Sequence, residues 1–221
     1  MEPNKLVVRG TVQLNGNEQA VALYNKIVFE KGGVLHLNQE KKLQVKSIAT
    51  FADTEDSSKD VILVLRPAPF LTPATQGVAG LDGIAGLSGQ AGENGLNGGD
   101  GVDGQIGVDM SPTTLVLGKV EGNLIINAGG GDGQAGGAGG QGGNGGAGSP
   151  QGNGGDGGKG GNGGDGGNGT LVTIYYESVA GDIIFNPVGG NSGKPGVGGT
   201  AGKGFHPGDN GANGGWGQLG E

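Results

Sequence analysis

The sequence predicts a mainly β protein with polyglycine-II, in which β-solenoid-like or sandwich strands carry a bundle of left-handed polyglycine-II helices. Glycine occupies every third position over long stretches, a period that fits a left-handed helix with three residues per turn. Short runs rich in β-branched residues precede and separate these stretches. A unit of roughly 60 residues, made of strand, turn, strand and glycine run, occurs twice.

The first predicted domain, residues 1–70, is a β-rich segment. Turn signals at Asn15-Gly16-Asn17 and Lys31-Gly32-Gly33 separate its apolar runs. Apolar and polar residues alternate in Val34–Leu37 and Leu43–Ile48, as they do in half-buried strands. The spacing of the runs leaves a meander, a sandwich and the rungs of a β-solenoid open, and the later repeat favours the solenoid. The predicted strands are residues 6–8, 11–14, 27–29, 34–37, 43–45 and 61–65.

The second predicted domain, residues 71–221, combines a repeated strand unit with three glycine runs. The two copies, residues 115–127 and 171–186, share the pattern Val-x-Gly-[Asn/Asp]-[Leu/Ile]-Ile-[Ile/Phe]-Asn. Repeats usually stack, so we expect strands of one copy beside those of the next. The glycine frame covers residues 77–107, 130–169 and 190–220, and it misses only at Gln151 and Phe205.

In a helix with three residues per turn, each position of the frame forms its own face. The position after glycine is often apolar in the first run, and we expect this stripe to lie against the β part; its residues are Val78, Leu81, Ile84, Leu87, Leu96 and Val102. From Gly136 the pattern becomes mostly Gly-Gly-x, so two bare faces can each have a close neighbour. We expect the chain to reverse at Ser149-Pro150-Gln151 and at Phe205-His206-Pro207. A collagen-like trimer is the alternative, although the first run contains no proline.

Composition restricts the classes of partner. The net charge of −8 disfavours nucleic acid and anionic membrane surfaces, which bind clustered Lys and Arg. The chain has no cysteine and no apolar run long enough to span a bilayer, so we expect no disulfide framework and no membrane insertion. Residues 1–5 do not resemble a signal peptide. A trimmed chain, another export route and release by lysis stay open.

Catalytic chemistry has little support. The two histidines, His36 and His206, lie in a strand pattern and at an expected corner, and their spacing to other residues gives no catalytic arrangement. The residues Gly98–Asp103 match a calcium-binding nonapeptide only in part, without tandem repetition. We therefore expect a protein that is not an enzyme and that holds neither a cofactor nor a metal.

Exposed aromatic residues at turns are the candidate binding residues, because aromatics on a rigid scaffold form many recognition surfaces. Trp216 and Phe205 lie in a segment with few other bulky side chains. The alternative is a purely structural role, in which they cover the ends of the bundle. One of Tyr175 and Tyr176 must point away from the core of a regular strand. The full set is Trp216, Phe205, His206, Tyr175, Tyr176 and Phe70.

The glycine runs, above all Gly154–Gly169, resemble known polyglycine-II bundles. These include the tips of T-even-type phage tail-fibre adhesins, the springtail antifreeze proteins and the N-terminal domain of Obg-type GTPases, although no GTPase domain follows here. Runs that end in a β segment such as Thr170–Tyr176 are also similar to bacterial collagen-like repeat proteins.

From this scaffold we predict a non-enzymatic extracellular or cell-surface structural or adhesive module. Its turns would bind a cell-surface protein, a glycan or neighbouring subunits of a fibre. The alternative is an ice-binding protein with a flat surface.

Overall fold

A computed structural model of the chain describes residues 4–14, 21–37, 42–50 and 61–221. These residues form ten β-strands and no helix. The strands are β1 (Lys5–Val8), β2 (Thr11–Leu14), β3 (Val21–Phe29), β4 (Val34–Leu37), β5 (Lys42–Thr50), β6 (Val61–Leu65), β7 (Thr113–Glu121), β8 (Leu124–Gly129), β9 (Val172–Ala180) and β10 (Ile183–Val188).

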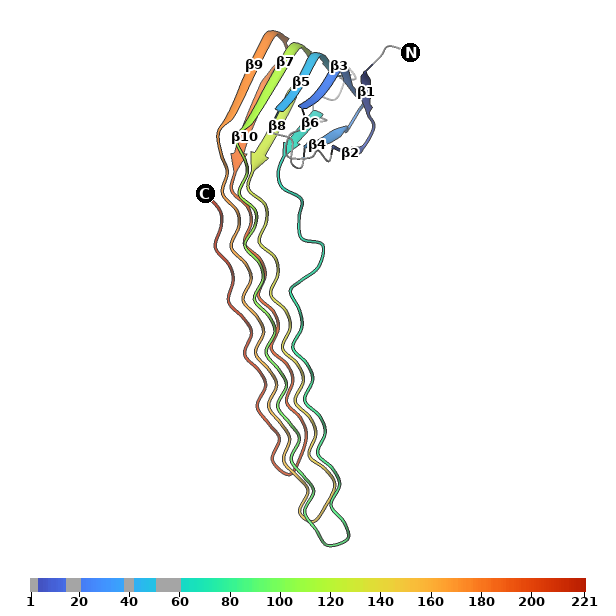
Figure 1. Cartoon of the computed structure of the whole chain (residues 1–221), viewed down its shortest axis with the longest axis vertical. Helices are drawn as coiled ribbons and strands as arrows, with labels where there is room; N and C mark the ends of the chain where they lie inside the picture. Colours follow the sequence, from blue (N-terminus) through green and yellow to red (C-terminus); the bar gives the residue numbers. More distant parts are fainter. Residues whose placement is uncertain (1–3, 15–20, 38–41, 51–60) are drawn as a thin grey trace.

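The strands build two five-stranded sheets that face each other at one end of an elongated molecule (Figure 1). The odd-numbered strands form one sheet in the order β1-β3-β5-β7-β9, and the even-numbered strands form the other. Every pair of neighbours is parallel. Each coil of the chain therefore gives one strand to each sheet, and five coils are stacked. Strands from both predicted domains belong to the same two sheets.

The turn within a coil is tight and uses glycine where the backbone needs a positive φ. Gly10 precedes β2 with φ of 60°, and Gly122 and Gly181 stand in the corresponding turns before β8 and β10 with φ of 93° and 127°. The expected stacking of the two repeat copies is confirmed, because β7 pairs with β9 and β8 with β10 at a constant offset, as in Leu124 opposite Ile183.

The hydrophobic core lies between the two sheets. Alternate side chains of β4 and β7 point into it, as the alternation in the sequence predicted. His36 stands between the buried Leu35 and Leu37 and is itself half-buried, so its side chain is on the other face of β4. The fully buried side chains are Val8, Ile27, Phe29, Leu35, Leu43, Ile48, Leu63, Leu65, Leu115, Leu117, Leu124 and Ile126.

The fold prediction needs a correction. Its mainly-β part fits the structure, but its bundle of left-handed polyglycine-II helices is wrong, because the described residues contain no helix and their regular structure consists of two parallel five-stranded sheets. The glycine runs are extended segments outside both sheets. The backbone N–H and C=O groups of the glycine runs form hydrogen bonds with adjacent segments, and these bonds do not require a helix.

Six such segments form a rod below the sheets (Figure 1). We number them in chain order: segment 1 is residues 72–88, segment 2 is 90–109, segment 3 is 130–148, segment 4 is 150–169, segment 5 is 189–204 and segment 6 is 206–221. Odd-numbered segments run away from the sheets and even-numbered segments return. The expected reversals at residues 149–151 and 205–207 are confirmed, since segments 3 and 4 and segments 5 and 6 are antiparallel neighbours.

Backbone hydrogen bonds recur every third residue and connect the segments in two layers. In segment 3, the N–H of Gly140 donates to Gly99 O of segment 2, and the N–H of Gly139 donates to Val197 O of segment 5, both at 2.8 Å. The carbonyl of Gly140 accepts from Gly158 of segment 4, and that of Ala138 accepts from segment 1. Segment 3 therefore has four neighbours, whereas segments 1 and 6, at the ends of the strip, have two.

The number of neighbours explains where glycine occurs. A Cβ at Gly139 would overlap the carbonyl oxygen of Gly158, and a Cβ at Gly140 would overlap that of Val78. In segments 3 and 4, two positions of each triplet face a neighbouring backbone at this distance. Both positions therefore need glycine, which explains the Gly-Gly-x pattern of these segments. Segment 1 is covered at one position only, so the next position can carry a large side chain.

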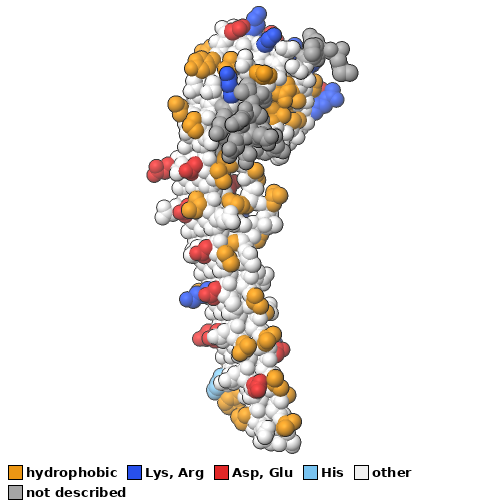
Figure 2. Space-filling model, in the orientation of Figure 1, with side chains coloured by type: hydrophobic (Ala, Val, Ile, Leu, Met, Phe, Trp, Pro, Cys, Tyr) orange, Lys and Arg blue, Asp and Glu red, His pale blue; other side chains and the backbone are white. Residues whose placement is uncertain are grey.

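The expectation that the apolar stripe packs against the β part is wrong. Its side chains, on segments 1 and 2, are 54–80% exposed. The segments leave the end of the sheets instead of lying along them (Figure 1), so no sheet lies beside these side chains. Figure 2 shows apolar side chains along the lower rod, with most acidic side chains on the opposite side of that view and some among the apolar ones.

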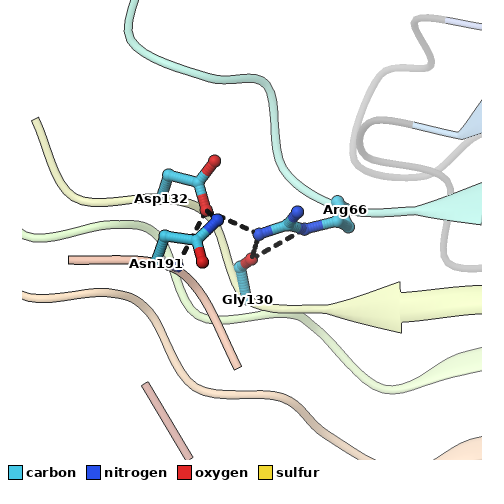
Figure 3. A network of polar contacts seen from close by, with 4 residues as sticks. All are labelled: Arg66, Gly130, Asp132 and Asn191. Atoms are coloured by element: carbon cyan, nitrogen blue, oxygen red, sulfur yellow. Dashed lines mark hydrogen bonds and ion pairs between the residues drawn. The ribbon is translucent and has the colours of Figure 1, made fainter. Parts of the chain in front are cut away.

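A network around Arg66 joins the sheets to the rod (Figure 3). Its guanidinium donates to Gly130 O at 3.0 and 3.1 Å and, through Nη2, to Asp132 Oδ1 at 2.7 Å. The same carboxylate oxygen accepts hydrogen bonds from the backbone N–H and the Nδ2 of Asn191. The side chain of Arg66 is 26% exposed. One residue after β6 thus fixes the first residues of segments 3 and 5.

Candidate binding surface

Side chains of Asn and Asp keep the rod segments in register. The Oδ1 of Asp100 on segment 2 accepts the backbone N–H of Lys159 on segment 4 at 2.7 Å, and the Oδ1 of Asp165 on segment 4 accepts that of Gln218 on segment 6 at 2.7 Å. These bonds recur at offsets of 59 and 53 residues. In many triplets the backbone N–H of the non-glycine residue donates to such a side chain and not to a backbone carbonyl of a neighbouring segment. We call these bonds the Asx ladder.

Phe205 and His206 form the turn between segments 5 and 6, near the end of the rod far from the sheets (Figure 1). The backbone of this turn is fixed by segment 4: the N–H of Phe205 donates to Gly152 O at 3.0 Å, and the carbonyl of His206 accepts from Gly154 at 2.8 Å. The two rings meet edge to face, with centroids 4.6 Å apart and an interplanar angle of 74°. Phe205 is 61% exposed and His206 is also exposed.

Trp216 lies further up segment 6 and is 67% exposed. The adjacent N–H of Gly215 donates to Asn162 Oδ1 at 2.8 Å, so the backbone beside the indole belongs to the Asx ladder. His206 connects to the same ladder at Asn153. The two attachment points are therefore nine positions apart on segment 4, and Trp216 is not part of the turn.

The remaining candidate residues lie at the other end of the molecule. Tyr175 and Tyr176 are both 60% exposed on β9, the last strand of its sheet. Tyr176 pairs with Leu117, which is fully buried on the coil before, so the core ends at this strand. Phe70, 36% exposed, lies in the connection between β6 and segment 1.

The six residues do not form one site. Only Phe205 and His206 are in ring contact among the described residues. The sequence reasoning also missed two features of the rod. The Asx ladder had a signal, the Asn or Asp at regular positions of the glycine frame, whereas Arg66 had none, because its partners are 64 and 66 residues away.

The described residues hold no group of three or more His, Cys, Asp or Glu that could bind a metal ion. Asp100 and Asp103, which belong to the partial calcium motif, already accept backbone hydrogen bonds from segment 4. A search of the same part of the chain finds no helix that is long and apolar enough to cross a membrane.

No family model and no curated protein matches the chain. One solved structure is similar: a springtail antifreeze protein from Granisotoma rainieri, a nine polyproline type II helical bundle whose crystal waters match the ice lattice. The identity is 29%, over 60% of this chain and 94% of that chain, with a TM-score of 0.12. Of the resemblances expected from the sequence, the comparisons therefore support the one to springtail proteins only through this structure. At that TM-score the similarity carries no argument about fold or function.

Proposed function

We propose that this chain is a non-enzymatic structural or adhesive module that acts outside the cell or at its surface. In this proposal the rod holds the turn of Phe205 and His206 away from the sheets, where it meets a cell-surface protein or a glycan. The observation that carries the proposal is an exposed pair of rings on a backbone that segment 4 fixes by hydrogen bonds. A turn ordered before binding loses little conformational entropy when the ligand arrives.

The rod supports this role because it separates the turn from the hydrophobic core. The core side chains lie between the sheets, and the three turns of the rod lie at the opposite end of the molecule (Figure 1). Changes in the turn therefore leave the core intact. Exposed aromatic rings such as these offer apolar area to apolar groups of a ligand.

The test is binding of the full chain to immobilised glycans and to intact cells. Replacing Phe205 by Ala should weaken binding about tenfold or more, since aromatic hot spots contribute most of the affinity of small contact areas. His206→Ala should have a smaller effect in the same direction. Gln218→Ala, an exposed polar change on segment 6, is the matched control. Full retention of binding by both Phe205→Ala and His206→Ala, with the fold intact by circular dichroism, would contradict the proposal.

The alternative function, binding to ice, is favoured by a different observation. The Asx ladder aligns rows of side chains across segments 2, 4 and 6, as in Asn97, Asp156 and Asp209. Such rows make one broad face of the rod regular. Thermal hysteresis of the purified chain separates the alternatives, because an ice-binding face does not need Phe205.

A further inference from the structure

The outer edge made by segments 1 and 2 differs in character from every other surface of the rod. We call it the aliphatic edge; its residues are Val78, Leu81, Ile84, Leu87, Leu96 and Val102. The backbone bonds place Leu96 opposite Leu81, whereas Glu93 lies opposite Ile84. On segment 1 four aliphatic side chains thus follow one another at every third position along the rod, and Leu96 and Val102 of segment 2 lie beside this row.

The opposite edge, made by segments 5 and 6, provides an internal comparison. The outward positions of segment 6 there carry Asn210 and Asn213, with Trp216 and Leu219 as the large apolar side chains. Two of these, Asn210 and Asn213, accept backbone N–H groups of segment 5. The rod architecture is therefore compatible with a polar edge, and nothing in its hydrogen bonding requires aliphatic residues on segments 1 and 2.

We propose that the aliphatic edge binds the same edge of a second copy of this chain and so forms a two-fold dimer. The six side chains together expose on the order of 400 Å² of apolar surface, within the range of the largest patch on a typical monomer. Two such edges would bury about 800 Å² of apolar surface. Because apolar atoms make up about 60% of an interface, the total would be about 1,300 Å², above the roughly 1,000 Å² that a stable contact needs.

The geometry of segment 1 favours a second copy as the occupant. Its apolar residues recur at every third position from Val78 to Leu87, so this row can lie against the same row of a second copy under a two-fold axis. Among the described residues, acidic side chains of segments 2 and 4, such as Asp103 and Asp165, accept ladder bonds from the backbone N–H groups of segments 4 and 6. The chain carries a net charge of −8, which opposes association, and Glu93 is the one charged residue at the outward positions of this edge between Val78 and Val102.

The arrangement of coils also fixes the orientation of the two copies. Segment 1 follows the third coil, and the first two coils, β1 to β4, extend beyond it on the side of the aliphatic edge (Figure 1). Two rods lying side by side with their sheets at the same end would bring these coils into collision. An antiparallel pair avoids it, because the first two coils of each copy then lie beyond the rod tip of the other copy. The dimer does not depend on which ligand the turn at Phe205 binds.

The experiment measures the mass of the full chain by sedimentation at several concentrations. We expect a dimer for the unchanged chain and at least a tenfold weaker dimer for Leu81→Glu with Leu96→Glu. Trp216→Glu, an equally exposed substitution on the opposite edge, should leave the dimer intact. Raising the salt concentration should strengthen the dimer, because salt screens the repulsion between the acidic chains.

Cross-linking adds a readout that does not depend on stability. The chain has no cysteine, so a single Leu81→Cys chain should cross-link to itself through a short thiol reagent and Trp216→Cys should not. A mixture of Val78→Cys and Leu87→Cys chains should give the mixed product if the copies are antiparallel. A monomer at all concentrations, or a dimer that keeps its strength in the double Glu variant, would overturn the proposal. Loss of glycan or cell binding would leave it standing.

Discussion

At the scale of single residues, the rod depends on hydrogen in place of a side chain at each enclosed position. Gly161 in segment 4 donates to Gly137 O at 2.8 Å, and a Cβ there would overlap the carbonyl oxygen of Val102 on segment 2. Backbone cannot move aside as a flexible side chain can. Gly215, on the exposed face of segment 6, is different, because a Cβ would meet only Asn162 Oδ1, at 3.3 Å.

Replacing Gly161 by Ala should therefore lower the free energy of unfolding by about 3 kcal/mol or more, through overpacking against rigid backbone. Gly215→Ala is the matched control and should change it by no more than about 0.5 kcal/mol, since Ala also restricts the unfolded chain. Urea denaturation followed by circular dichroism measures both. Equal effects of the two substitutions would show that the glycine positions are not sterically enclosed.

The Asx ladder gives a second prediction at this scale. Asp165 Oδ1 accepts the backbone N–H of Gln218, which is not an acidic residue. Asp165→Ala removes the acceptor and should cost about 0.5–1.5 kcal/mol, with water limiting the loss at this exposed position. Asp165→Asn keeps an Oδ1 and should retain more than half of that contribution. Thermal unfolding of the two variants compares them, and an Asn variant as weak as the Ala variant would argue that charge, not the hydrogen bond, is what matters.

At the scale of elements, the strands could be predicted because their sequences show alternation or runs of β-branched residues. Val34–Leu37 alternates and is β4, and the repeated Val-x-Gly pattern placed β8 and β10 in stacked copies, with the turn glycines Gly122 and Gly181 at positive φ. The predicted strands at residues 27–29 and 43–45 lie inside the longer β3 and β5. Their ends were missed because polar residues such as Lys26 and Lys46 continue a strand whose other face is buried.

The structure and packing of the glycine runs were predicted less accurately, for a physical reason. A period of three shows which positions are bare, but it does not show which neighbour covers each of them. The aliphatic edge was expected to pack on the sheets, yet the segments leave the sheet end, so Leu81 and Leu96 face outward. Likewise the candidate aromatics were separated in space, since Trp216 and Tyr175 belong to elements at different heights of the molecule. Only contacts between segments, which are long-range, decide these points.

At the scale of the whole molecule, stability should vary across the strip of six segments. Segment 3 is bonded to four neighbours and segment 1 to two, and the N–H of Gly140 and of Gly80 both donate to a carbonyl at 2.7–2.8 Å. Opening segment 1 breaks its bonds to segments 2 and 3 only, whereas opening segment 3 breaks bonds to segments 1, 2, 4 and 5. Local opening follows the number of interactions that must break, so segment 1 should open without the rest of the rod.

Native-state hydrogen exchange tests this difference with matched amides, since both probes are glycines with similar intrinsic rates. Gly140 and the other glycines of segments 3 and 4 should exchange at least about tenfold more slowly than Gly80, because each net hydrogen bond contributes about 1 kcal/mol. If the dimer forms along the aliphatic edge, dilution should speed exchange at Gly80 and leave Gly140 unchanged. Equal rates at both glycines would mean that the rod opens only as a unit. In that case its cooperativity, not its number of neighbours, would set the protection of every segment.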